Sequence, residues 1–248
     1  MDPEINLKAA VSNLYKAFAK YPANPNMDGS PMYADNLDQW NRDLTCKPLH
    51  ELSGDDLRIF YFKAMTTWGD VADFKHFLPR IFELLTQYDL DIDEWPALSK
   101  LNYGKWRIWP EPEQAAVEEY LLAFWQYLLR SFDYKAEAHF SDYFVAIANV
   151  YPRFRTLLDL WEAAFPQALV HLVNFVECNS KAVLQRQTLD SIYKLEVAGR
   201  YFYKWLTTEA MLAKLEAAFF ETTDEEFAQK VSIVIQLIEG HRNKLLNS

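Results

Sequence analysis

The sequence has few of the residues that build sheets, tight turns and covalent crosslinks. Only six of its 248 residues are glycine and only two are cysteine. Leu and Ala, which favour helices, far outnumber the β-branched Val and Ile. The two cysteines, Cys46 and Cys178, lie far apart, so we expect free, buried thiols rather than a disulfide. This composition predicts an all-α fold.

The chain also lacks long apolar runs and an excess of basic side chains. No segment approaches the roughly 20 apolar residues that cross a bilayer, and the first residues lack the layout of a secretion signal. We therefore expect a cytoplasmic protein with no membrane contact. Its 35 acidic and 25 basic side chains give a formal net charge of −10, which repels nucleic acid and attracts a basic partner.

Half of the residues are hydrophobic, which is enough to bury a core, and residues 1–248 are predicted to form one domain of about 8–10 helices. Two stretches are rich in turn formers instead. The first is a long irregular connection over about 21–52, and the second is a loop over about 88–110 with room for one short helix. Helical periodicity covers residues 3–20, 53–65, 71–87, 111–132, 140–150, 152–164, 166–178, 189–207, 208–220 and 224–246.

One internal echo bears on how these helices pack. Residues 79–85 and 152–158 share the form P-R-apolar-x-x-L-L, and another predicted helix precedes each copy. Paired helical hairpins of this kind occur in HEAT-like repeats. We therefore expect either a short HEAT-like stack or an irregular bundle. Pro79 falls within a predicted helix, where it should open a new helix or kink one.

Signatures of catalysis are weak. The sequence has no phosphate-binding Gly-rich loop, H-E-x-x-H, G-x-S-x-G or paired C-x-x-C. The weak catalytic candidates are Asp73 and His76, which would share one helix face as an acid/base pair. The simpler interpretation is that Asp73 caps the helix and His76 is a hydrogen-bonded side chain at its edge. Likewise, Trp68 either lines a ligand pocket or fills the corner between two helices.

Four residues are candidates for a metal site, but ordinary packing explains their presence better. Cys46 and His50 have a spacing compatible with zinc, and His171 and Cys178 would complete a tetrahedral set. The last two lie in an apolar helix and are expected to share its core-facing side. We therefore expect no metal and no cofactor.

The loop over residues 100–109 is the strongest candidate for a binding surface. It gathers aromatic and basic side chains, a composition enriched in binding hot spots. On a chain with a net charge of −10, one such loop favours contact with a protein over nucleic acid. Together with Trp68, the candidate binding residues are Tyr103, Lys105, Trp106, Arg107 and Trp109.

Residues 67–80 carry a longer motif, T-W-G-D-V-A-D-F-K-H-F-L-P-R. This segment resembles a family of uncharacterised bacterial proteins with the signature T-W-G-x-x-x-D-F-K-H-F-L-P-R. The resemblance covers the motif and the helix predicted before it, and it implies no activity, cofactor or site residue. It also implies a cysteine pair upstream of the motif, where this sequence has only Cys46. That difference counts against a metal site.

Three functions remain open at this point. The leading hypothesis is a non-catalytic protein-binding protein, most specifically a bacterial immunity protein or inhibitor that covers the active site of a basic toxin. The second is a small-molecule enzyme, which requires Trp68, Asp73 and His76 to meet in one solvent-reached cleft. The third is a helical-repeat scaffold that grips a peptide in a groove between successive hairpins. The oligomeric state is not indicated by any of these patterns.

Overall fold

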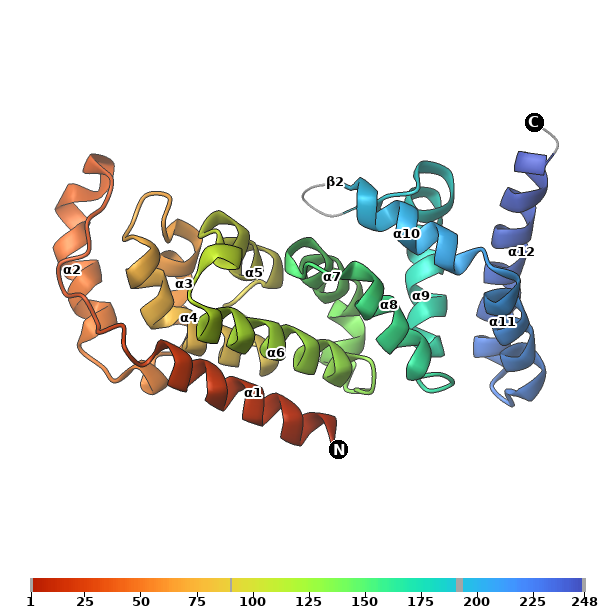
Figure 1. The fold of residues 1–248 in the computed structure, drawn as a ribbon, viewed down its shortest axis with the longest axis horizontal. Coiled ribbons are helices and arrows are strands. Elements are labelled where there is room, and N and C mark those ends of the chain that lie inside the picture. The colour runs from red at the N-terminus through yellow and green to blue at the C-terminus, as the bar shows by residue number, and fades with distance from the viewer. Residues whose placement is uncertain (1, 90, 191–193, 247–248) are drawn as a thin grey trace. The chain divides into compact units, whose positions relative to one another are not determined.

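A computed structural model of the chain describes residues 2–89, 91–190 and 194–246 (Figure 1). These residues form twelve α-helices and one two-stranded hairpin, so the expected all-α class is confirmed with more helices than predicted. None of the described helices is long and apolar enough to cross a membrane. By its internal contacts the chain divides into two compact units, unit 1 (Met1–Tyr127) and unit 2 (Leu128–Ser248). A single domain over residues 1–248 stays a prediction.

Unit 1 is built on a long amphipathic first helix. This helix, α1 (Pro3–Phe18), packs on α4 (Val71–Thr86), and α3 (Gly54–Lys63) packs on both α4 and α5 (Glu94–Tyr103). Asp2 accepts a hydrogen bond from the Glu4 amide at its start, and Pro3 suits the first turn because proline needs no amide partner there. The helices of unit 1 are α1 (Pro3–Phe18), α2 (Ala34–Thr45), α3 (Gly54–Lys63), α4 (Val71–Thr86), α5 (Glu94–Tyr103) and α6 (Glu111–Leu128).

The connection predicted over residues 21–52 is more ordered than its composition suggests. It contains α2, which Figure 1 shows at one edge of unit 1, and two short 3-10 turns, η1 (Pro31–Tyr33) and η2 (Leu49–Glu51). A third 3-10 turn, η3 (Trp106–Ile108), follows α5. Only Asn41 and Leu44 of α2 are buried. Leu37, Trp40 and Leu44 recur at helical spacing, but the Pro- and Gly-containing residues before them led to the prediction of one irregular connection.

The structure shows where the two prolines of the repeated P-R motif lie. Pro79 lies inside α4, which continues to Thr86 rather than restarting at the proline. Its counterpart in the echo, Pro152, stands before the first residue of α8. The two P-R pairs therefore occupy different points of their helices, and the echo does not mark equivalent helix starts.

Unit 2 has shorter connections and one feature that the sequence did not indicate. Residues 189–207 were predicted as one helix, and the first part of this prediction is wrong. Strands β1 (Leu189–Asp190) and β2 (Lys194–Leu195) pair there as an antiparallel hairpin before α10 begins. The helices of unit 2 are α7 (Tyr134–Val150), α8 (Phe154–Ala163), α9 (Leu169–Ser180), α10 (Glu196–Leu206), α11 (Glu209–Glu221) and α12 (Glu225–Leu246), and a π-helical segment, η4 (Lys181–Arg186), follows α9.

The core of unit 2 is an aromatic cluster contributed by four helices. The ring of Phe144 on α7 lies 5.0 Å from that of Trp161 on α8 and 5.1 Å from that of Phe175 on α9. Phe202 on α10 lies 5.4 Å from Phe175. These tilted and edge-to-face contacts suit the quadrupoles of the rings. The cluster joins α7, α8, α9 and α10 by apolar contact.

Candidate functional site

Trp68 lies in the core of unit 1 and holds the irregular connection to it. The side chain is 3% exposed, and its ring lies 5.2 Å from Trp40 and 5.3 Å from Phe60. Its Nε1 donates to Asn41 Oδ1 at 2.9 Å, and Asn41 Nδ2 donates to the Met27 carbonyl at 2.9 Å. Trp68 therefore fills the corner between two helices, as the simpler interpretation expected.

The residues beside Trp68 form a short backbone bridge to the same connection. The Gly69 amide donates to the Asp28 carbonyl at 2.7 Å, and the Ser30 amide donates to the Thr67 carbonyl at 2.8 Å. Gly69 has φ +64°, and a Cβ there would lie 2.9 Å from Asp73 Oδ2. Glycine is therefore favoured at this position, because a side chain there would be strained and would crowd Asp73.

Asp73 and His76 also bond to the connection. Asp73 Oδ2 accepts from the Asp70 amide at 2.9 Å in a capping box, and its Oδ1 accepts from Asn24 Nδ2 at 3.0 Å. His76 Nδ1 lies 2.9 Å from the Tyr21 carbonyl oxygen. Asp73 borders a hollow of about 320 Å³ whose described lining includes neither His76 nor Trp68. These three residues share none of the hollows whose linings are described.

Further along α4, a charged network lies in the core. Glu113 of α6 is fully buried; Lys75 Nζ lies 2.7 Å from its Oε2, and Lys20 Nζ lies 2.6 Å from its Oε1. The Tyr21 hydroxyl donates to Oε1 at 2.8 Å. Burial alone would raise the pKa of the Glu113 carboxyl, but hydrogen bonds from Lys20, Lys75 and Tyr21 outweigh it and leave this pKa below its ordinary value. The network joins the residues that follow α1 to α4 and α6 through charge.

The aromatic loop divides between core and surface. Trp106 and Trp109 are buried, and Trp109 Nε1 donates to the Gly104 carbonyl at 2.8 Å. The ammonium of Lys75 lies 4.4 Å from the Trp109 ring centroid, a cation–π contact. Both tryptophans thus pack inside unit 1. Because an apolar ring in a basic loop satisfies core and surface patterns equally, the sequence could not separate the two.

Four other residues of that loop are exposed. Tyr103 is 56% exposed and Ile108 is 78% exposed, and Lys105 and Arg107 lie at the surface between them in sequence. We call these four residues the Tyr103 surface. Apolar, aromatic and cationic side chains in one short segment are typical of protein contacts.

Beneath this surface, Lys100 acts on the backbone. Its Nζ donates to the carbonyls of Phe62 and Ala64, both at 2.8 Å, where α3 ends. Burial lowers the pKa of the Lys100 ammonium to about 8. A cation at the C-terminus of a helix is favourable, so Lys100 fixes the end of α3.

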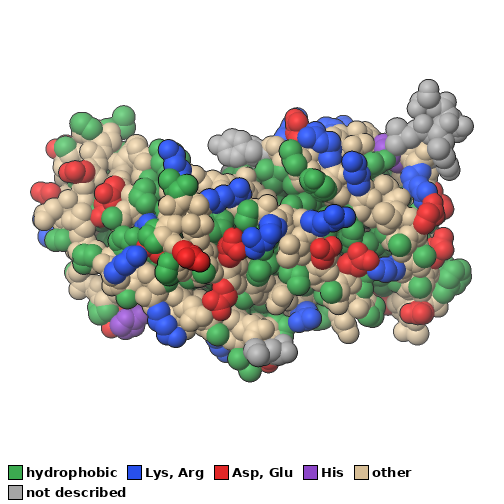
Figure 2. Space-filling model, viewed as in Figure 1, with side chains coloured by type: hydrophobic (Ala, Val, Ile, Leu, Met, Phe, Trp, Pro, Cys, Tyr) green, Lys and Arg blue, Asp and Glu red, His purple; other side chains and the backbone are tan. Residues whose placement is uncertain are grey.

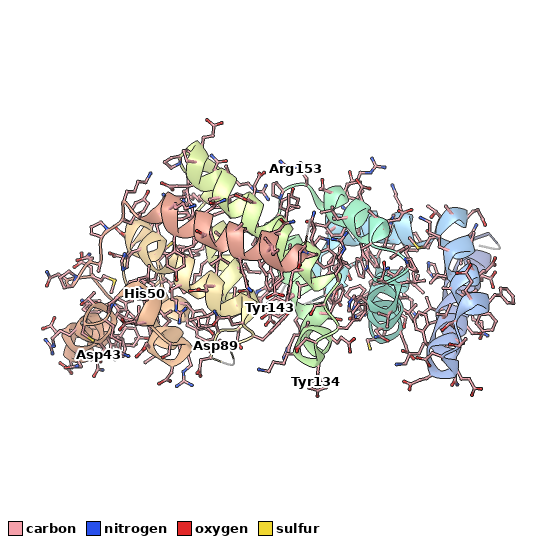
Figure 3. All side chains as sticks on the ribbon, turned by 90° about the horizontal axis from the view of Figure 1, so that it is seen from below. Asp43, His50, Asp89, Tyr134, Tyr143 and Arg153 are labelled. Carbon is pink, nitrogen blue, oxygen red and sulfur yellow. The ribbon has the colours of Figure 1, made fainter. Side chains whose placement is uncertain are left out.

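A larger hollow lies between α1 and the end of α4, and sequence reasoning missed it. It has a volume of about 670 Å³, and His50, labelled in Figure 3, stands at its border. Tyr15 Oη and Arg80 Nη1 both donate to Glu83 Oε2 at 2.6 Å, whereas Glu83 Oε1 accepts no hydrogen bond from a described residue. Burial, and then Glu83, raise the pKa of the Tyr15 hydroxyl. We call this site the Glu83 hollow.

Only part of the Glu83 hollow could be predicted from the sequence. Arg80 and Glu83 are three residues apart on one helix, a spacing that brings their side chains together. Tyr15 comes from a helix far away in sequence, and no local pattern pairs it with Glu83. The hollow is therefore a product of the packing of α1 on α4.

The four residues of the possible zinc site lie in different surroundings. Cys46 and Cys178 are free and exposed, so the expected burial of these thiols is wrong. His171 is buried, with its ring 4.3 Å from Phe140 and nearly parallel to it, whereas Cys178, two turns further along the same side of α9, is exposed. Across residues 2–89, 91–190 and 194–246, no three His, Cys, Asp or Glu side chains are grouped to hold a metal ion.

Comparison of the chain with family models, with curated proteins and with solved structures finds no match in any of the three. The resemblance of residues 67–80 to a bacterial family stays a prediction. What the structure adds is a role for the motif in folding, because its tryptophan, glycine, aspartate, lysine and histidine all bond to the connection or to α6.

Proposed function

We propose that the chain is a non-catalytic protein-binding protein with a basic partner, and that unit 1 makes the contact. The observation that carries this proposal is the distribution of charge. Unit 1 contains 20 acidic and 12 basic side chains, whereas unit 2 contains 15 and 13, so unit 1 holds −8 of the net −10. Charge of one sign on one part of a protein steers the opposite charge toward it.

The Glu83 hollow is the contact point we propose for a lysine or arginine of the partner. Leu7 and Val11 give its wall an apolar character, which suits the aliphatic stem of such a side chain. Glu83 Oε1 is then the acceptor for the ammonium or guanidinium group at the tip. Arg80 already offsets part of the Glu83 charge, so we expect an affinity that depends on several contacts rather than on this one alone.

More specifically, we propose that the chain is a bacterial immunity protein or inhibitor. It would act in the cytoplasm by covering the active site of a basic toxin. The Tyr103 surface supplies a second set of contacts of the hot-spot type. The hydrogen bonds of Asp73 and His76 support binding over acid/base chemistry, because both side chains hold residues 21–24 in place.

The test is capture of partners by the full-length chain in its source organism, quantified by mass spectrometry. We expect a basic protein that is released as salt rises and that Glu83→Gln recovers about fivefold less well. Glutamine can still accept the bonds from Tyr15 and Arg80, so the fold should persist. Asp38→Asn is the matched control, since it removes one exposed charge of unit 1 far along the chain from the hollow.

Three results would count against the proposal. They are the absence of any protein partner, an acidic partner, and equal recovery of the partner by Glu83→Gln and Asp38→Asn. The immunity form has its own test: the captured protein should arrest growth when expressed alone, and coexpression of this chain should restore it. A captured protein that is harmless alone would remove the immunity form and leave binding in place.

A further inference from the structure

Unit 2 contains a hollow that is lined by basic side chains, in contrast to the acidic charge of unit 1. It has a volume of about 850 Å³ and lies between the starts of α8 and α10. Its described lining includes Arg153, Arg155 and Lys194, and Glu196 is the one acidic side chain among them. Arg153 is labelled at the start of α8 in Figure 3, and Figure 2 shows Lys and Arg side chains over α8 and α10. We call this site the Arg155 hollow.

The positive charge of this hollow is only partly balanced within the protein. Arg155 is exposed and makes no ion pair with a described residue. Lys194 faces Asp190 across the hairpin, but Asp190 is also bonded to Arg186. The acidic Glu196 lies 3.7 Å from Arg200, which offsets its charge. An anion entering the hollow would therefore meet a net positive field.

The two helix starts add to this field. Neither α8 nor α10 has a side-chain cap at its N-terminus, so the first amide groups of both helices lack such a partner. These ends carry partial positive charge and favour carboxylates. The helix starts alone would not make a site, but here they border the same hollow as three cationic side chains.

The wall of the hollow is apolar, and this favours a peptide carboxylate over an inorganic anion. Val197 and Tyr201 lie one turn apart on α10 and are 62% and 53% exposed. A bare inorganic ion would leave these side chains in water. A peptide with carboxylates and apolar side chains would cover them while pairing with the cations.

We infer that the Arg155 hollow binds an acidic peptide segment of a partner protein. The occupant is defined by charge complementarity, since the hollow is a cationic site on a chain whose net charge is −10. The inference goes beyond the proposed function, because it concerns another unit and a ligand of opposite charge. Either can fail without the other.

The test is fluorescence anisotropy with the full-length protein. The probe is a fluorescein-labelled peptide of about twelve residues in which Asp and Glu alternate with Leu and Phe. We expect it to bind at low ionic strength and to weaken as NaCl rises, with its Asn/Gln counterpart binding at least about tenfold more weakly. Absence of binding, or equal binding of the Asn/Gln peptide, would overturn the inference.

Substitutions in the Arg155 hollow test whether the acidic peptide binds there. Arg155→Ala and Lys194→Ala should each weaken the acidic peptide about fivefold, because each removes one cation from the hollow. Tyr201→Ala should weaken it as well by removing the apolar wall. Lys135→Ala is the matched control, since Lys135 is exposed, lies in unit 2 and does not line the hollow. Circular dichroism melting curves establish that each variant is folded.

Two further outcomes would contradict the account. If Arg155→Ala and Lys135→Ala bind the peptide equally, the hollow is not its site. If inorganic phosphate displaces the peptide more effectively than NaCl of the same ionic strength, and Tyr201→Ala has no effect, the site takes a small anion and the peptide assignment is wrong.

Discussion

The two units differ in what they bury. Among the described residues, the buried polar side chains of unit 1 are Asn41, Asp73, Lys75, Lys100 and Glu113, and those of unit 2 are His171 and Thr188. Unit 1 has a long connection with few apolar residues, and polar bonds fix it to α4 and α6. Unit 2 has shorter links, and its helices meet through the aromatic cluster. Unit 1 therefore depends on specific polar geometry, and unit 2 on apolar contact.

The largest effect that tests this comparison is expected for Glu113→Ala. Removing the carboxylate leaves Lys75 buried without its ion pair, which should lower the free energy of unfolding by about 3 kcal/mol or more. Chemical denaturation followed by tryptophan fluorescence measures the change. The matched control is Glu111→Ala, an exposed acidic residue in the same first turn of α6, which should cost less than about 1 kcal/mol. Equal losses in the two variants would show that the buried network contributes little.

A smaller loss is expected for Asn41→Ala. This change leaves Trp68 Nε1 and the Met27 carbonyl without partners, at a cost of about 1–3 kcal/mol. Hydrogen exchange of residues 27–30 should also accelerate, because the bridge to Gly69 loses support. Asn36→Ala, at an exposed position of the same helix, should leave both quantities nearly unchanged. Unchanged exchange at residues 27–30 in Asn41→Ala would show that the connection is held by other contacts.

A pH dependence is expected in unit 2. Burial lowers the pKa of His171 to about 4 from an ordinary 6.5. Unfolding therefore takes up a proton between pH 4 and 6.5, and acidification through this range should lower the free energy of unfolding. His171→Phe keeps a ring beside Phe140 and should flatten the melting temperature over this range relative to the natural chain. Parallel pH profiles for the two proteins would contradict this assignment.

Unit 1 should respond to acid at lower pH. The folded pKa of Glu113 lies below its ordinary value of 4.5, so the stability it contributes is complete above pH 4.5 and is lost as pH falls through the folded pKa. Acidification should therefore weaken unit 2 first and the Glu113 network afterwards. This order follows because unit 2 buries a neutral base, His171, whereas unit 1 buries an acid in ion pairs, Glu113.

Most helices could be predicted from the sequence, because they carry an apolar stripe or acidic first turn. The last helix was expected over 224–246 and is found over Glu225–Leu246. Helix α2 was missed because Leu37, Trp40 and Leu44 form only a short apolar stripe, which directly follows residues rich in turn formers. The hairpin before α10 was missed because each of its strands has only two residues, too few to show the alternation of a strand.

The candidate sites were less accessible to prediction. The sequence indicated the exposed Tyr103 and Arg107, but in the same loop it could not distinguish the buried Trp106. Glu113 resembles any acidic residue in a first helical turn, and only its contact with Lys75 shows that it is buried. Both hollows join segments distant in sequence, so their lining residues became apparent only from packing.

The same comparison extends to the surfaces, where we propose a basic partner for unit 1 and an acidic peptide for unit 2. Hydrogen exchange of the full-length protein with a basic and then an acidic peptide tests this division most directly. The account predicts that the basic peptide slows exchange in residues 4–15 and 83–87, and that the acidic peptide slows it in 148–156 and 194–201. Protection of the same segment by both peptides, or of neither pair of segments, would contradict it.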